Sequence, residues 1–124
     1  MRTRVSKRQE RLNSQMVREV SDILIRKISD PRLQWVTIIR AQVSPDIREA
    51  RIFIRTLAEG EEKQKVLTAL RGASGFIRYE LGKRLKLRVI PNIIFEDSEA
   101  ELSQAEKVVR IISKIQTEKG VQDG

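Results

Sequence analysis

Two glycines and two arginines near the middle of the chain have a spacing that could do chemistry. Gly72 and Gly75 enclose an Ala-Ser pair, with Arg71 just before them and Arg78 three residues after. On a straight helix Arg71, Gly75 and Arg78 would share one stripe, and the missing side chains would let a phosphate backbone approach between the guanidinium groups. Glycine also disfavours helix, so the pair could instead mark a kink whose arginines are simply solvated. These residues alone leave both interpretations open.

The segment Gly72-Ala73-Ser74-Gly75 matches the GxxG pattern, with which KH domains clamp a nucleic-acid backbone in a loop between two helices. GxxG is short and occurs often by chance. Here, however, helical periodicity lies on both sides of Gly72–Gly75, predicted strands lie beyond it, and basic residues flank it. These surroundings favour nucleic-acid contact over a purely structural kink.

The charge of the chain indicates a polyanionic partner. Its 124 residues carry a formal charge of +8 and give a pI near 10.3, which favours nucleic acid over an anionic membrane. No apolar run approaches the ~20 residues that span a bilayer, and we find no signal peptide. Aromatic residues make up only 4%. We therefore expect recognition of phosphates and of RNA shape, without bases stacked on an aromatic platform.

Basic residues gather at the N-terminus and in the central stretch, whereas acidic residues gather elsewhere, which suggests a basic face and an acidic face. A solvated surface is the structural alternative for these charges. The candidate RNA-binding residues are the cations of the two basic stretches and the residues of the kink: Arg4, Arg8, Arg11, Arg71, Ala73, Ser74, Gly75, Arg78, Lys83, Arg84, Lys86 and Arg88.

The composition argues against an enzyme. The chain has no cysteine and no histidine, which removes disulfides, thiolate nucleophiles, the commonest zinc ligand and the commonest general base. Asp46 with Glu49, and Asp97 with Glu99, could hold a metal ion for a nuclease, but a turn and a helix cap explain both pairs. No phosphate-binding P-loop is present. We expect no catalysis, no cofactor and no metal, and the absence of cysteine fits a reducing cytoplasm.

Apolar spacing predicts the elements that position these residues. Ser6 and Gln9 form a capping box at the start of a first helix, which Asp30-Pro31 ends. Residues 35–43 are rich in β-branched side chains and have apolar residues on both sides, so we expect a strand covered on both faces over at least part of its length. Residues 49–57 alternate with a period of two and complete an antiparallel hairpin.

The second half of the chain is predicted to contain helix, strand and helix. Apolar residues recur at helical spacing from Val66 to Leu85, and residues 87–95 follow as a strand in which Pro91 marks an edge or a bulge. A last helix covers about 98–119. This order predicts one α+β domain over 1–124, in which helices pack on one face of a three-stranded sheet. Within it we place a basic arm at 1–5 and a core at about 6–97.

Several short motifs together resemble one family over roughly residues 4–115. They are Asp30-Pro31-Arg32-Leu33, Val36-Thr37-Ile38, Val43-Ser44-x-Asp46, Ala50-x-Ile52-x-Ile54, Ala73-x-Gly75-x-Ile77-Arg78, Leu87-Arg88-x-x-Pro91-x-Ile93-x-Phe95 and Asp97-Ser98. Their joint order and spacing resemble ribosome-binding factor A, a family of bacterial small-subunit assembly factors.

The resemblance implies a type II KH-like fold in which an Ala-x-Gly kink, here Ala73–Gly75, replaces the GxxG loop. Gly72 restores a literal GxxG, so a tight kink and a looser turn both stay open. The resemblance also implies a non-enzymatic factor that binds the free, immature 30S subunit and its 16S rRNA. Such a factor supports late maturation and 5′-end processing of that rRNA and growth in the cold. We expect a cytoplasmic protein, monomeric off the ribosome; the alternative is a basic architectural DNA-binding protein.

Overall fold

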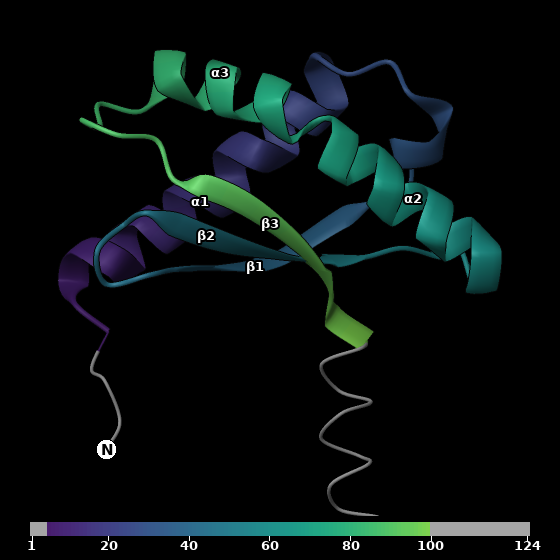
Figure 1. Ribbon diagram of the computed structural model, residues 1–124, viewed down its shortest axis with the longest axis horizontal. Helices are drawn as coiled ribbons and strands as arrows, with labels where there is room; N and C mark the ends of the chain where they lie inside the picture. Colours follow the sequence, from purple (N-terminus) through teal and green to yellow (C-terminus); the bar gives the residue numbers. More distant parts are fainter. Residues whose placement is uncertain (1–4, 100–124) are drawn as a thin grey trace, which may run out of the picture.

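In a computed structural model, which describes residues 5–99, helices gather on one side of a three-stranded sheet (Figure 1). The elements are α1 (Lys7–Arg26), the short 3-10 helix η1 (Pro31–Leu33), β1 (Thr37–Val43), β2 (Glu49–Arg55), α2 (Gly60–Gly72), α3 (Ser74–Arg84) and β3 (Asn92–Asp97). The α+β class and the predicted order are confirmed. The arm predicted at 1–5 and the helix predicted at about 98–119 lie almost entirely outside the described residues.

Helix α1 begins as its sequence predicts. The Gln9 backbone N–H donates to Ser6 Oγ at 3.1 Å, and the Ser6 backbone N–H donates to Gln9 Oε1 at 3.0 Å, so the capping box is complete. The helix ends at Arg26, before the predicted end at Asp30-Pro31. Asp30 instead caps η1, because its carboxylate accepts the Arg32 backbone N–H at 3.0 Å.

The three strands are in the order β1-β2-β3, with β1 antiparallel and β3 parallel to β2. The hairpin of β1 and β2 is confirmed. The expectation that the first strand is covered on both faces is wrong, and the reason is a β-bulge: Ile38 pairs with Ile54, but Arg40 pairs with Phe53. The extra residue, Ile39, shifts the register by one. The buried residues of β1 therefore all face the helices, although their spacing in the sequence is irregular.

The third strand also differs from its prediction. It starts at Asn92, and residues 87–91 form a loop that leads from α3 to the sheet (Figure 1). Pro91 is fully buried and stands immediately before the strand, where its missing N–H removes no ladder bond. The strand is at an edge of the sheet, as the proline indicates. The shorter strand leaves the 87–91 loop available to form part of a surface.

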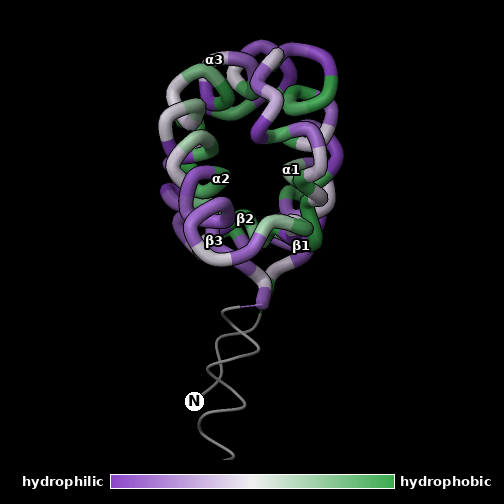
Figure 2. The backbone as a smooth tube through the Cα atoms, turned by 90° about the vertical axis from the view of Figure 1, so that its right-hand side faces the viewer, coloured by the Kyte–Doolittle hydropathy of each residue, from purple (hydrophilic) through white to green (hydrophobic). Residues whose placement is uncertain are grey.

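One hydrophobic core fills the space between the helices and the sheet, and Figure 2 shows the two layers from the side, with α3 above the strands. Met16 of α1, Ile52 of β2 and Leu70 of α2 have no exposed surface. On the open face of the sheet Phe53 is only 1% exposed, and the Arg40 guanidinium lies 3.8 Å from its ring centroid. Within the described residues no helix is long and apolar enough to cross a membrane.

Candidate nucleic-acid interface

The junction of α2 and α3 is a tight kink, because Ala73 alone separates the two helices. The Ala73 backbone N–H donates to the Ala69 carbonyl at 3.0 Å, and the Ile77 N–H donates to the Ala73 carbonyl at 2.9 Å. Helical hydrogen bonding therefore continues on both sides of the break. This resolves the choice between a tight kink and a looser GxxG turn in favour of the kink.

The two glycines beside the kink are not required by the fold. A Cβ atom added to Gly72 or Gly75 would meet nothing within 4 Å, and neither residue has a positive φ. Both are exposed. The glycines therefore leave open surface at the kink, which a partner backbone could approach closely.

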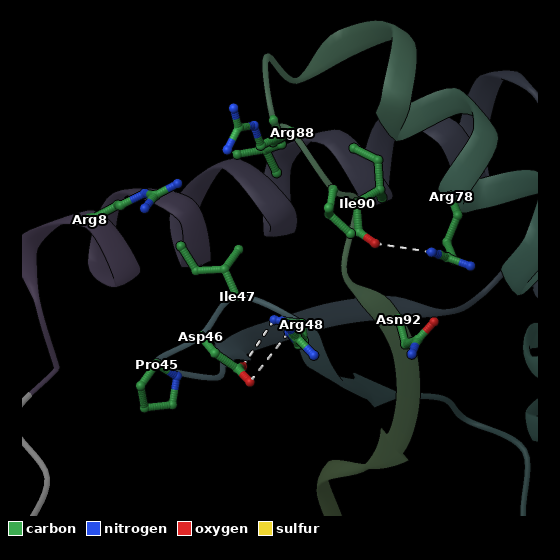
Figure 3. Close-up of a pocket in the computed structure, with 11 residues that line it drawn as sticks. Arg8, Pro45, Asp46, Ile47, Arg48, Arg78, Arg88, Ile90 and Asn92 are labelled. Carbon is green, nitrogen blue, oxygen red and sulfur yellow. Dashed lines mark hydrogen bonds and ion pairs between the residues drawn. The ribbon is translucent and has the colours of Figure 1, made fainter.

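A concave surface lined by several cations lies at the end of the sheet where α1 begins. We call it the basic groove. It is lined by Arg8, Pro45, Asp46, Ile47, Arg48, Arg78, Leu87, Arg88, Val89, Ile90 and Asn92, and its volume is about 560 Å³. Four arginines reach it from four segments of the chain: the start of α1, the β1–β2 turn, α3 and the α3–β3 loop (Figure 3). Such convergence concentrates positive potential in one place.

Two side-chain hydrogen bonds hold the start of α1, which carries Arg8, against the end of β1. Gln9 Nε2 donates to the Val43 carbonyl at 3.0 Å, and the Val43 N–H donates to Asn13 Oδ1 at 2.8 Å. Gln9 follows Arg8 on α1, and Val43 ends β1 just before the turn that carries Arg48. The start of α1 is therefore held against the β1–β2 turn by directional bonds as well as by packing.

Arg48 is not among the cations that the sequence predicts as RNA contacts, because it lies in a turn outside the two basic stretches. Ser44 Oγ donates to Asp46 Oδ1 at 2.7 Å, and the Arg48 backbone N–H donates to the same oxygen at 3.1 Å. The Ser44 hydroxyl first, and this N–H second, hold the pKa of Asp46 below its ordinary value. Arg48 Nε is 4.0 Å from the other Asp46 oxygen. The Arg48 backbone carbonyl accepts the Asn92 N–H at 2.9 Å, which ties the turn to the start of β3.

Arg78 of α3 is the third arginine of the basic groove, and uncharged backbone carbonyls hold its guanidinium group. Its Nε donates to the Pro91 carbonyl at 3.2 Å. Its Nη2 donates to the Ile90 carbonyl at 3.0 Å, the bond drawn in Figure 3. These bonds attach the α3–β3 loop to α3. They orient the guanidinium without cancelling its charge, because a carbonyl group carries no net charge.

Arg8 and Arg88 complete the groove as exposed side chains. Neither makes a hydrogen bond or an ion pair with any residue between 5 and 99. Their charges are therefore available to a ligand. Phosphate oxygens are suitable acceptors, because a guanidinium group can donate to them with two parallel bonds.

A shallower depression continues the basic groove toward the kink. It is lined by Gly75, Arg78, Tyr79, Gly82, Lys83 and Ile90, so it shares Arg78 and Ile90 with the groove. Lys83 Nζ lies 4.4 Å from the centroid of the Tyr79 ring and 3.6 Å from a Glu80 carboxylate oxygen. The depression brings the predicted kink residue Gly75 close to the predicted cations Arg78 and Lys83.

Arg84 points away from this surface into a group of charges between α3 and α1, which we call the Arg84 cluster: Arg84, Glu19 and Asp22. Arg84 Nη1 is 3.0 Å from Glu19 Oε2 and 2.6 Å from Asp22 Oδ2, and the Arg84 side chain is 21% exposed. Hydrogen bonding from Arg84, with a further contribution from Arg26, lowers the pKa of the Asp22 carboxyl. Arg84 thus joins two helices, which is a structural role that the basic run in the sequence did not indicate.

The remaining predicted contacts are distributed more widely. Arg11, Arg71 and Lys86 are exposed but line neither the basic groove nor the depression beside it. Ala73 and Ser74 are half-buried at the kink, where Ser74 Oγ donates to the Leu70 carbonyl at 3.3 Å. Arg4 lies outside the described residues. Within residues 5–99 no three side chains of the metal-binding types are grouped to hold an ion.

Comparison with known proteins gives a consistent result. The model of the family described as ribosome-binding factor A matches residues 8–112. A solution NMR structure of a Thermotoga maritima protein, described as a putative member under the same name, is 30% identical with a TM-score of 0.66; the match covers 77% of this chain and 91% of that one. The crystal structure of ribosome-binding factor A from Thermus thermophilus is 25% identical with a TM-score of 0.64, over 72% and 94% of the two chains.

One further structure shows a relative in a complex. It is a homology model of the Thermus thermophilus ribosome binding factor A, fitted into a cryo-electron-microscopy map of a complex with the 30S subunit. It is 25% identical to this chain with a TM-score of 0.60, over 72% of this chain and 93% of that one.

Proposed function

The chain belongs to the ribosome-binding factor A family, and from this premise we propose that it binds the free, immature 30S subunit through its 16S rRNA. In this proposal the protein makes and breaks no covalent bond. By occupying the immature subunit it supports late maturation and 5′-end processing of the rRNA. The coarser description, a ribosome-binding factor, follows from the family itself.

The observation that carries the proposal is the convergence of Arg8, Arg48, Arg78 and Arg88 on the basic groove. Asp46 is the single carboxylate among the groove-lining residues, and it already accepts the Ser44 hydroxyl and the Arg48 N–H. A net positive, partly enclosed surface of this kind suits a phosphate backbone, whose condensed counterions are released on binding. The relative seen with the 30S subunit favours rRNA as the polyanion.

The other predicted residues extend this surface in our proposal. Gly75 and Lys83 line the depression next to the groove, so an RNA backbone could run from the groove to the kink formed by Ala73, Ser74 and Gly75. Arg11, Arg71 and Lys86 are exposed and can make peripheral phosphate contacts, as is proposed for Arg4. Arg84 contributes indirectly, by holding α3 against α1.

A matched pair of double variants tests the proposed surface. Arg48→Gln with Arg88→Gln removes two groove charges, and Arg18→Gln with Arg55→Gln removes two exposed charges elsewhere. We expect the groove variant to bind 30S subunits about tenfold or more weakly. Its log–log salt slope should fall by roughly 0.7–0.9 for each phosphate that the variant no longer neutralises. Equal effects of the two variants on affinity and slope would contradict the assignment of the groove.

A basic architectural DNA-binding protein is the competing function, since a cationic groove binds any polyanion. Competition separates the two: labelled 30S subunits are displaced with unlabelled duplex DNA and with unlabelled subunits at physiological salt. Our proposal expects DNA to compete at least about a hundredfold less well, in the range by which specific binding exceeds non-specific binding. Equal competition would favour the DNA-binding function.

The cellular part of the proposal concerns location, oligomeric state and rRNA maturation. We propose a cytoplasmic monomer that consists of one domain and cosediments with free small subunits in a lysate gradient. Depletion should cause precursor 16S rRNA with an unprocessed 5′ end to accumulate, most strongly at low temperature. Incubating labelled precursor with magnesium and purified protein alone should leave it intact, and cleavage would contradict the non-enzymatic role.

A further inference from the structure

Five of the residues that line the basic groove are apolar, which binding to a phosphate backbone alone does not explain. They belong to the β1–β2 turn and to the α3–β3 loop, and we call them the apolar floor: Pro45, Ile47, Leu87, Val89 and Ile90. Val89 is 63% exposed, although it lies next to cationic side chains. Phosphates gain nothing from apolar surface, whereas the face of a nucleobase does.

Ile47 provides a second, independent observation. Its φ is +59°, the only positive φ of a non-glycine residue within 5–99, and a β-branched residue is a genuine outlier there. The left-handed conformation is unfavourable for a side chain of this shape. The turn enforces it, because the Ile47 N–H donates to the Ser44 carbonyl at 2.9 Å and the Glu49 N–H donates to Ser44 Oγ at 3.0 Å. The strained backbone places an isoleucine, where glycine would be easier, at the junction of the core and the groove.

A polar group stands at the same floor. Asn92 lines the groove, and its side-chain amide makes no hydrogen bond with any other residue of the described part of the chain. An amide offers both donors and an acceptor, which is the pattern that reads the edge of a base. Figure 3 shows Asn92 on the strand below the loop of Ile90 and beside Arg48. The groove therefore combines apolar surface, a base-reading group and flanking cations.

We propose that the basic groove holds one unstacked nucleotide of the bound RNA. Its base lies on the aliphatic floor formed by Ile47, Val89 and Ile90, and its flanking phosphates lie on the guanidinium groups at the rim. The volume of about 560 Å³ falls within the roughly 300–1,000 Å³ of small-molecule sites and exceeds what a single phosphate needs. This proposal rests on the proposed function, because it takes the ligand of the groove to be rRNA.

The proposal restricts the RNA that fits. A base inside a duplex is paired and stacked, so only a bulged, mismatched or single-stranded nucleotide reaches the floor without a large cost. The floor is aliphatic, so the site differs from an aromatic stacking platform. The arginine contacts weaken as salt rises, whereas the contact of a base with the floor does not. Selectivity for an unpaired nucleotide should therefore persist at salt concentrations that weaken overall binding.

The test uses the full chain and two RNA hairpins that are identical except for one bulged 2-aminopurine. We expect the bulged hairpin to bind at least about fivefold more tightly than the perfect hairpin. The ratio of the two affinities should stay constant between low and moderate salt. The fluorescence of the 2-aminopurine should change on binding. Val89→Ser should reduce the ratio of the two affinities toward one, because the bulged base loses an aliphatic contact. The control Ile25→Ser removes an aliphatic side chain that is 81% exposed and outside the groove, and should leave the ratio unchanged.

The outcomes separate this inference from the function on which it rests. If wild type binds both hairpins equally, or if Val89→Ser and Ile25→Ser change the ratio equally, the nucleotide site is overturned. The proposed function stands in that case, provided that Arg48→Gln with Arg88→Gln still weakens binding of 30S subunits. If that arginine variant has no effect on 30S binding, both proposals fail. Urea unfolding of Val89→Ser should match wild type, because this side chain is mostly exposed.

Discussion

Arg78 and Arg84 lie on the same short helix, yet they belong to regions with opposite functions. Arg78 reaches the basic groove and donates to two backbone carbonyls. Arg84 lies in the Arg84 cluster and donates to two carboxylates, those of Glu19 and Asp22. The first guanidinium is oriented but keeps its charge for a ligand, and the second uses its charge to hold α1 and α3 together.

The difference shows that the acceptors of a basic side chain must be known before the residue can be assigned as an RNA contact. Two close carboxylates on another helix neutralise Arg84 and make it a structural link, whereas the carbonyl partners of Arg78 preorganise it. The pair of Arg48 with Asp46, at 4.0 Å, is a looser contact. Exposure alone does not separate Arg78 from Arg84, since both are half-buried. The predictions below test this distinction, beginning with the largest expected effect.

Charge reversal in the basic groove should strongly weaken binding to 30S subunits and leave the stability of the fold unchanged. Arg48→Glu with Arg88→Glu replaces two attractions by two repulsions, so we expect affinity for 30S subunits to fall by about a hundredfold or more. Both side chains are exposed, so the melting temperature should stay close to that of wild type. Filter binding and thermal unfolding measure the two quantities. A large fall in melting temperature would place these arginines with Arg84 as structural links.

Removing the positive charge of Arg84 should lower the stability of the protein and change its affinity for 30S subunits little. Arg84→Met keeps most of the aliphatic stem but removes the cation of α3 from Glu19 and Asp22, which then keep only their partners on α1. We therefore expect the melting temperature to fall by several degrees. Affinity for 30S subunits, measured well below that temperature, should change by less than about threefold. Lys86→Met, an exposed neighbour, is the matched control and should change the melting temperature little. If Arg84→Met weakens binding as strongly as the groove variants, the contrast is incorrect.

The same cluster predicts a pH dependence of stability. The pKa of Asp22 is below its ordinary value chiefly because Arg84 donates to its carboxylate, so the folded state binds fewer protons than the unfolded state. The resulting stabilisation is complete above the ordinary aspartate pKa of about 4 and is lost as the pH falls through the lower pKa of the folded state. Urea unfolding at several pH values should show a smaller acid-induced loss in Arg84→Met than in wild type. Parallel curves would mean that the pair contributes nothing.

The smallest effect concerns the reach of the groove toward the kink. Gly75→Ala adds a methyl group in open space on α3, so the free energy of unfolding should rise by up to about 1 kcal/mol. If an RNA backbone passes closely at Gly75, affinity should nevertheless fall by a few fold. Gly72→Ala, at the other side of the kink and outside the depression, is the control for affinity. If the two variants bind 30S subunits with equal affinity, the RNA-binding surface does not extend past Arg78 to the kink.

Much of the fold could be predicted because its signals are local. Helical spacing in α1 and α2, the capping box of Ser6 and Gln9, and the break at Ala73 all depend on residues within a few positions of each other. The failures arise from tertiary structure. The bulge at Ile39 exists only in the pairing of β1 with β2, so the sequence of that strand, taken alone, indicates two covered faces. Val89 is mostly exposed in a loop, although the run 87–95 has the composition of a strand.

The site was less predictable than the fold for the same reason. Arg8, Arg78 and Arg88 were candidates because they lie in basic runs, but their convergence depends on how the elements pack. Arg48 stands alone in a hairpin turn and carries no local signal. Its place depends on tertiary contacts, among them the bond that joins its carbonyl to Asn92. Arg84 has the sequence context of a ligand-binding residue and the contacts of a structural one.

The contacts that Gln9 and Asn13 make with Val43 have a consequence for how fast the protein finds its partner. They hold the backbone segments that carry Arg8 and Arg48 at a fixed separation before any RNA binds, so this part of the groove is preorganised. Encounter then requires no ordering of these two segments, and the search is limited by diffusion and by the shape of the rRNA. We therefore expect no slow phase in association from a rearrangement of these two segments.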